Sequence, residues 1–142
     1  METGYDALGR KISQTDQNNR TTSFAYDALG RLSSVIDTLG NRTTYTYDEV
    51  GNKLTQTDAE GRITSWTYDN NGRILSHTLP MGQTELFEYD ANGNMLSHID
   101  FNGTTVSSSY DSLGRLLTRT TPDDTEEYSY TASGQVESVT TS

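Results

Sequence analysis

Polar and bulky side chains alternate along short stretches of this chain. In three of these stretches Thr and aromatic residues stand at every second position: Thr22, Phe24 and Tyr26; Thr43, Tyr45 and Tyr47; Thr64, Trp66 and Tyr68. A period of two in β-branched and aromatic residues predicts a β-strand with one aromatic face. A second run, rich in Ser, Thr and aliphatic residues, follows each stretch, for example over residues 32–37 and 54–58. We therefore expect two strands in each unit of the pattern.

The unit recurs every 21 residues as Tyr-Asp-x-x-Gly, usually followed by Arg or Asn. A degenerate seventh copy, shifted by one residue, begins at Tyr130-Thr131 and contains Gly134. A fixed period of this length is typical of a tandem array in which each unit packs on its neighbours. The motif residues are Tyr5, Asp6, Gly9, Tyr26, Asp27, Gly30, Tyr47, Asp48, Gly51, Tyr68, Asp69, Gly72, Tyr89, Asp90, Gly93, Tyr110, Asp111 and Gly114.

Asp-x-x-Gly also occurs at the other end of the unit, and it predicts tight turns at both ends. Asp favours the first position of a type I turn, and Gly tolerates the positive φ that a three-residue hairpin loop needs. Eleven of the twelve glycines occupy these positions, whereas Gly4 does not, and Asn19 replaces Gly once. Turns are thus expected near residues 7–9, 17–19, 28–30, 38–40, 49–51, 59–61, 70–72, 80–82, 91–93, 101–103, 112–114 and 122–124.

Turns this closely spaced leave no room for a helix or a crossover connection. The predicted fold class is all-β, an antiparallel up-and-down meander of thirteen or fourteen strands in about seven repeats. Natural strand twist would make such a sheet coil. We expect residues 1–142 to be a single array and a piece of a longer one.

The odd period adds a constraint, because side chains alternate between the two faces of a sheet. If both loops hold three residues, one residue per repeat must break the alternation, as a bulge or as a change in loop length. Adjacent aliphatic residues just after the first turn are the expected position of a bulge or of a sheet buried on both sides: Ile74-Leu75, Met95-Leu96 and Leu116-Leu117.

The motif resembles a known family. Residues 26–32 (YDALGRL) and 110–116 (YDSLGRL) are similar to the YD repeats of Rhs proteins, which also occur in insecticidal Tc toxin complexes and in teneurins. The resemblance covers essentially the whole chain. It implies a long β-sheet that spirals into a hollow shell, which in bacterial members encloses a toxic C-terminal polypeptide. The resemblance also implies a self-cleaving, Asp-containing segment that closes the shell and releases the toxin, and no segment of this chain matches it.

Composition and charge limit the classes of partner that the chain could bind. The chain is 31% hydrophobic with a mean hydropathy of -0.73, and only the repeat argues for an ordered structure. A net charge of -10 without a basic run disfavours a nucleic-acid partner. No long apolar run predicts a membrane span, and no leader is present, so a secretion signal would lie outside this chain. Cysteine is absent and excludes disulfides and thiolate metal sites.

Three groups of residues could carry chemistry. Successive motif Asp residues would lie about 9.6 Å apart, too far to share one calcium ion, and are expected to stabilise turns. The aromatic row could stack sugars, but a packed face of cross-strand ring contacts is the simpler interpretation. His77 and His98 occupy equivalent positions in neighbouring repeats and lack a third ligand, so we expect surface residues rather than a zinc site.

These observations leave three hypotheses for function. In the first, the chain is a wall segment of a hollow shell, its partners being the rest of the parent shell and an enclosed C-terminal toxin. In the second, a cell-surface array binds glycan or protein through its aromatic face or turn tips. In the third, unpaired edge strands join copies of the chain into homo-oligomers or fibres. No catalytic residue, cofactor or metal is expected, and the predicted location is secreted or on the bacterial surface.

Overall fold

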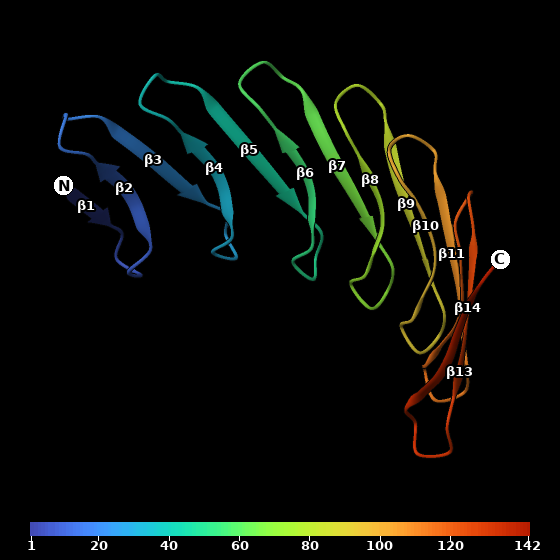
Figure 1. The fold of residues 1–142 in the computed structure, drawn as a ribbon. Coiled ribbons are helices and arrows are strands. Elements are labelled where there is room, and N and C mark those ends of the chain that lie inside the picture. Colours follow the sequence, from blue (N-terminus) through green and yellow to red (C-terminus); the bar gives the residue numbers. More distant parts are fainter. The chain divides into compact units, whose positions relative to one another are not determined.

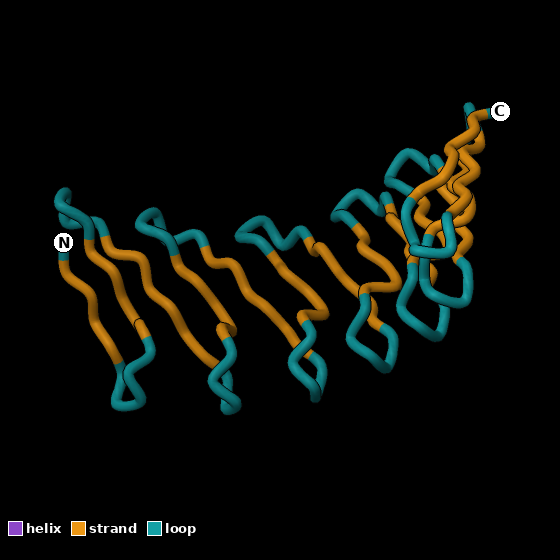
Figure 2. The backbone as a smooth tube through the Cα atoms, turned by 60° about the horizontal axis from the view of Figure 1, so that its bottom comes forward, coloured by secondary structure: helices purple, strands orange, loops and turns teal.

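The computed structural model describes residues 1–142, and every regular element in it is a β-strand (Figures 1 and 2). The predicted all-β class is confirmed. The fourteen strands are β1 Glu2–Tyr5, β2 Lys11–Thr15, β3 Thr21–Tyr26, β4 Leu32–Ile36, β5 Arg42–Tyr47, β6 Lys53–Thr57, β7 Ile63–Tyr68, β8 Ile74–Thr78, β9 Thr84–Tyr89, β10 Met95–Ile99, β11 Thr105–Tyr110, β12 Leu116–Thr120, β13 Thr125–Tyr130 and β14 Val136–Thr141.

The chain divides into two compact units, Met1–Thr67 and Tyr68–Ser142. In the first unit, β1 to β7 pair in chain order, and every pair is antiparallel. In the second unit, β8 to β14 do the same. Each unit is thus the up-and-down meander that the turn spacing predicts.

The loops have the expected three-residue geometry. At the loop after β3, the N–H of Asp27 donates to the carbonyl of Arg31 at 2.8 Å, and the N–H of Gly30 donates to the carbonyl of Asp27 at 3.0 Å. The eleven turn glycines all have positive φ, and Asn19 has φ 60. The turn between β12 and β13 is shorter, because the N–H of Thr121 donates to the carbonyl of Asp124 at 2.8 Å.

A β-bulge breaks the alternation just after the Tyr-Asp turn. Thr46 pairs with Thr55 but Tyr47 pairs with Lys53, which leaves Leu54 without a partner on β5. The same shift leaves out Leu96 between β9 and β10 and Leu117 between β11 and β12. The bulge that the odd period requires is confirmed at these two predicted positions. It returns the aromatic residues of successive repeats to one face.

The two faces of each meander differ in chemistry. We call the side that carries the motif tyrosines and the aromatic residue two positions before them the aromatic face. The other side, the hydroxyl face, carries paired Ser and Thr residues, and the Thr46 and Thr55 hydroxyls are hydrogen-bonded at 2.6 Å. A Ser109–Thr118 pair repeats this contact at 2.7 Å.

No large side chain is fully buried, and Ser34, 3% exposed, is the one buried residue. The repeats therefore do not enclose a hydrophobic core. Most side chains on the strands are half-buried against their neighbours in the same sheet. Backbone ladders, turns and contacts between adjacent hairpins must supply the stability that a core gives other domains.

Candidate functional site

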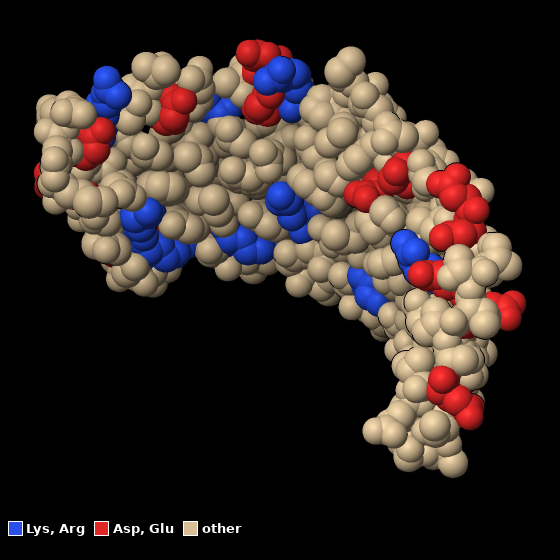
Figure 3. Space-filling model, viewed as in Figure 1, with Lys and Arg blue, Asp and Glu red and all other residues tan.

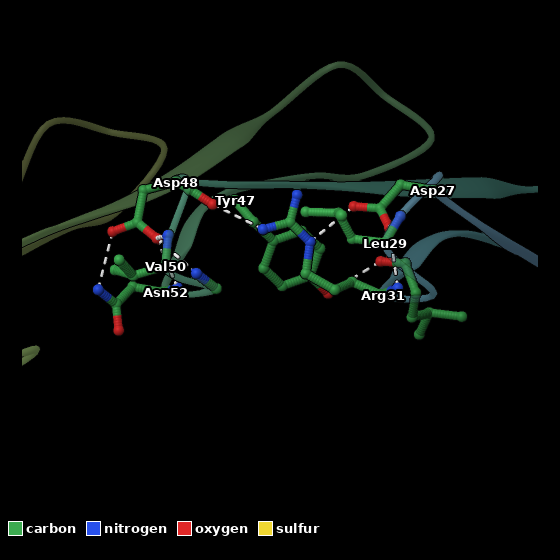
Figure 4. Close-up of polar contacts among 9 residues, drawn as sticks. Asp27, Leu29, Arg31, Tyr47, Asp48, Val50 and Asn52 are labelled. Carbon is green, nitrogen blue, oxygen red and sulfur yellow. Dashed lines mark hydrogen bonds and ion pairs between the residues drawn. The ribbon is translucent and has the colours of Figure 1, made fainter.

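The motif aspartate organises each Tyr-Asp turn. Asp27, directly after β3, accepts hydrogen bonds at Oδ1 from the N–H groups of Leu29 and Arg31, both at 2.9 Å. Its Oδ2 accepts a third from Arg31 Nε at 2.7 Å (Figure 4). The Arg31 backbone N–H and guanidinium hold the pKa of the Asp27 carboxyl below its usual value. Asp27 therefore bonds three N–H groups of its own turn.

The arginine that follows the turn glycine also reaches the next repeat. The Arg31 guanidinium lies over the Tyr47 ring at 4.9 Å, and its Nη1 donates to the carbonyl of Asp48 at 2.6 Å (Figure 4). In the second unit, Arg73 makes the same contacts with Tyr89 at 4.8 Å and with the Asp90 carbonyl at 3.0 Å. Asp, Arg and the next Tyr therefore form one connected group that joins consecutive hairpins.

The tyrosine hydroxyl adds a second link in the same direction. Tyr47 donates to the carbonyl of Leu32 at 2.8 Å, fifteen residues earlier. The pairing of β4 with β5 ends at Ser34 and Thr44, so the bulged end of β4 lies beyond the ladder. The hydroxyl thus satisfies a carbonyl where the strands no longer pair. Equivalent bonds join Tyr26 to Lys11 and Tyr130 to Leu116.

The aromatic row is covered rather than open. The Lys11 Nζ lies over the Phe24 ring at 4.4 Å, and the Lys53 Nζ lies over the Trp66 ring at 3.9 Å. The motif tyrosines from Tyr26 onward are half-buried, whereas Tyr5 is 61% exposed. Lysine side chains of the preceding repeat thus cover part of the aromatic row.

The structure brings His77 and His98 together around a residue that sequence reasoning missed. The His98 Nε2 lies 2.7 Å from Glu85 Oε1, and the His77 Nδ1 lies 3.6 Å from Glu85 Oε2. His98 also stacks on Phe87, with ring centroids 4.8 Å apart. The side chains of the two histidines are 24% and 30% exposed, so both are half-buried beside this glutamate. Glu85 is opposite His77 in the register, which the sequence spacing alone does not reveal.

This cluster is not arranged as a metal centre. Its closest polar atoms face one another across a hydrogen bond instead of converging on one point. No group of three or more His, Cys, Asp or Glu side chains is placed to hold a metal ion. No helix is long and apolar enough to span a membrane.

The arginines of the Tyr-Asp motif form ion pairs within their own turns. In Figure 3, Lys and Arg of the first unit lie at both ends of the strands, and the lower group is at the Tyr-Asp turns. Each arginine of the Tyr-Asp motif is paired with the aspartate of its own turn: Arg10 with Asp6, Arg31 with Asp27, Arg73 with Asp69, and Arg115 with Asp111. The turns therefore present closed ion pairs rather than a free cationic surface.

Two-strand repeats, bulged after each Tyr-Asp turn and linked by Arg and Tyr, define a YD-repeat array. The Teneurin YD-shell family matches residues 1–142, and the chain belongs to this family. No curated protein matches it significantly.

The fold is similar to that of Tc toxin proteins. One similar structure is a mutant Tc holotoxin pore of Photorhabdus luminescens, with 21% identity, a TM-score of 0.71, and coverage of 99% of this chain and 9% of that one. A TcdB2-TccC3-Cdc42 crystal structure gives 21% identity, a TM-score of 0.72 and the same coverage of 99% and 9%. A TcdB2-TccC3 crystal structure has 22% sequence identity and a TM-score of 0.54, and the match covers 96% of this chain and 7% of that one. The chain thus spans under a tenth of the length of these proteins.

Proposed function

We propose that residues 1–142 are a wall segment of a hollow YD-repeat shell that encloses a toxin or effector polypeptide. The carrying observation is the link from an Asp-Arg turn to the tyrosine and backbone of the next repeat, which Arg31 makes with Tyr47 and Asp48 and Arg73 makes with Tyr89 and Asp90. A contact between neighbouring hairpins that recurs along the array can extend a sheet indefinitely, although Asn52 and Asn94 replace the arginine in two repeats. The motif residues then have a structural role, and the chain is not an enzyme.

The similarity to Tc toxin structures supports the partners in this proposal. The chain spans about 9% of two of those proteins, so a complete wall needs many more repeats than the seven in this chain. The remainder of the parent shell is therefore the first partner, and an enclosed C-terminal polypeptide is the second. The whole assembly would be secreted or displayed on a bacterial surface.

The adhesion alternative draws less support. A glycan-binding sheet needs accessible ring faces, and Lys11 and Lys53 cover the rings of Phe24 and Trp66. Protein contacts through the turn tips remain compatible with a shell wall. We therefore retain the container as the function that the contacts favour.

Protease protection in the complete parent protein tests the proposal. The polypeptide encoded after the repeats should resist trypsin in the intact protein and be digested at least tenfold faster when expressed alone. Combined Arg31→Ala and Tyr47→Phe substitutions should shorten the protection, whereas Tyr5→Phe, at an exposed copy of the motif, should not. Equal digestion of the enclosed and free polypeptides would contradict a container.

A further inference from the structure

The hydroxyl face of the second unit contains a shallow apolar hollow. It measures about 270 Å³ and is lined by Leu75, Leu86, Phe87, Glu88, Ser97 and Ile99, from strands β8, β9 and β10. Leu86, Glu88, Ser97 and Ile99 are on the hydroxyl face, whereas Phe87 belongs to the aromatic face and lines the edge of the hollow. Leu86 is 43% exposed and Leu75 is 37% exposed. Leu86 and Ile99 are directly paired across the two strands. A contiguous aliphatic surface is thus left in water.

The hollow arises where this repeat departs from the others. Three positions before the motif tyrosine, where Leu86 stands, four other repeats have Ser or Thr: Ser23, Thr44, Ser65 and Ser107. At the position of Glu88, directly before the tyrosine, the other repeats have small or hydroxyl residues: Gly4, Ala25, Thr46, Thr67, Ser109 and Ser129. The array therefore folds without a leucine or a glutamate there, and the sheet itself does not require them.

The charge around the hollow is negative. Glu88 is exposed, lies opposite Ser97 and takes part in no ion pair. The unit 68–142 has eleven Asp and Glu residues against three Arg. All three arginines are already paired, Arg73 with Asp69, Arg115 with Asp111 and Arg119 with Glu126. A cation beside the hollow would find a carboxylate with no competing partner.

We propose that this hollow binds an extended polypeptide in which an aliphatic residue is separated by one residue from Lys or Arg, so that both side chains point to the same side. The aliphatic side chain would cover Leu75, Leu86 and Ile99, and the cation would pair with Glu88. The hollow is smaller than an ordinary small-molecule pocket, so it takes one side chain while the rest of the ligand stays outside. The inference stands apart from the proposed shell, because it concerns a local surface of the 142-residue chain.

Titration of the 15N-labelled chain with Ac-Arg-Ser-Leu-Ser-Arg-NH2 tests this site. Amides of residues 75, 86–88 and 97–99 should shift with millimolar affinity, and the shifts should weaken as salt is raised. Two control peptides, one with Glu in place of Arg and one with Ser in place of Leu, should bind at least fivefold more weakly. Equal binding of either control, or no shifts, would overturn the proposal.

Substitutions to the residues found in the other repeats test the aliphatic contact and the ion pair separately. Leu86→Ser, which copies Ser65, and Glu88→Thr, which copies Thr67, should each weaken the peptide at least about fivefold. Leu117→Ser is the matched control, because Leu117 has the same 37% exposure as Leu75 but does not line the hollow. Weakening by Leu117→Ser as large as that by Leu86→Ser would overturn the site. Decanoate binding to the hollow without peptide binding would assign it to a lipid and overturn the proposal as well.

Discussion

At the scale of single residues, Asp and Gly have different roles in each turn. Asp58 shows the pattern at the opposite end of the repeat, where Arg62 Nε lies 2.6 Å from its Oδ2. The glycine completes the loop by adopting a φ that other residues avoid. Neither role depends on the neighbouring strands, so local sequence is sufficient to predict both.

Replacing Gly51 with Val should destabilise the chain by about 1 kcal/mol or more, because its φ of 101 strains a β-branched residue. A Cβ at this position would meet nothing within 4 Å, so the cost is one of backbone conformation rather than of steric overlap. Gly51→Asn is the control, since Asn19 already adopts φ 60 in an equivalent loop. Urea unfolding measures the stability of both variants. A Val variant as stable as the Asn variant would contradict a backbone cost of positive φ at this position.

Acid should destabilise the chain through the turn aspartates. Backbone N–H groups of Arg31 and Arg115 lead the contacts that lower the pKa values of Asp27 and Asp111 from 3.8. A carboxyl whose pKa is lower in the folded state contributes its stability above the unfolded pKa, and that contribution is lost as pH falls through the folded pKa. The free energy of unfolding should therefore fall below about pH 4.

The measurement is urea unfolding between pH 6 and pH 3. Asp27→Asn should make the pH dependence shallower, because the variant retains the side-chain oxygen but loses the titrating group. Stability that is constant or rises toward pH 3 would show that these hydrogen bonds do not favour the charged carboxyl.

The His-Glu-His cluster marks the limit of residue-level prediction. His77 and His98 are recognisable as equivalent positions in neighbouring repeats, but Glu85 has no motif around it. Its role follows only from the pairing of His77 with Glu85 across β8 and β9. A register is a property of two strands together, and it has to be known before such a cluster can be found.

At the scale of the element, the bulge connects sequence parity to the contacts between hairpins. The odd period requires one extra residue per repeat, and Leu54 is one such residue. The parity argument predicts its position just after the Tyr-Asp turn. It does not predict that the tyrosine of the next repeat bonds the carbonyl beside the bulge, because that contact depends on where the ladder stops.

Removing one tyrosine hydroxyl should measure this link. Tyr47→Phe leaves the Leu32 carbonyl without its 2.8 Å hydrogen bond and should cost about 1 kcal/mol of unfolding free energy. Tyr5→Phe is a matched control at the same motif position, since Tyr5 is 61% exposed and donates no hydrogen bond. Equal stability of the two variants in thermal or urea unfolding would show that the hydrogen bond from Tyr47 to Leu32 does not stabilise the fold.

At the scale of the whole molecule, the composition alone would predict a disordered chain. A chain with 31% hydrophobic residues and no buried core resembles a disordered segment, and the repeat is what makes an ordered array predictable. A sheet of this kind has an unpaired strand at each edge. β1 and β14 each have one hydrogen-bonded neighbour. Neither strand contains the Lys or Pro that commonly blocks edge pairing.

The isolated 142-residue chain should therefore associate through its edges, and light scattering should report a mass above 15.7 kDa. A specific variant can test the route. Thr125 and Ser142 exchange both backbone hydrogen bonds, so alternation along the ladder directs the N–H of Val139 away from β13. Val139→Pro removes that outward donor and leaves the pairing with β13 intact, and it should lower the mass.

Ser138→Pro is the contrasting change, because Ser138 pairs with Ser129 two residues along from the hydrogen-bonded pair Glu127 and Thr140, and its N–H points toward β13. This variant should destabilise the last hairpin, detected as faster hydrogen exchange over residues 125–141. A wild-type chain that is strictly monomeric with both edges in water would count against the wall-segment proposal, because a segment of a continuous sheet needs neighbours on both sides.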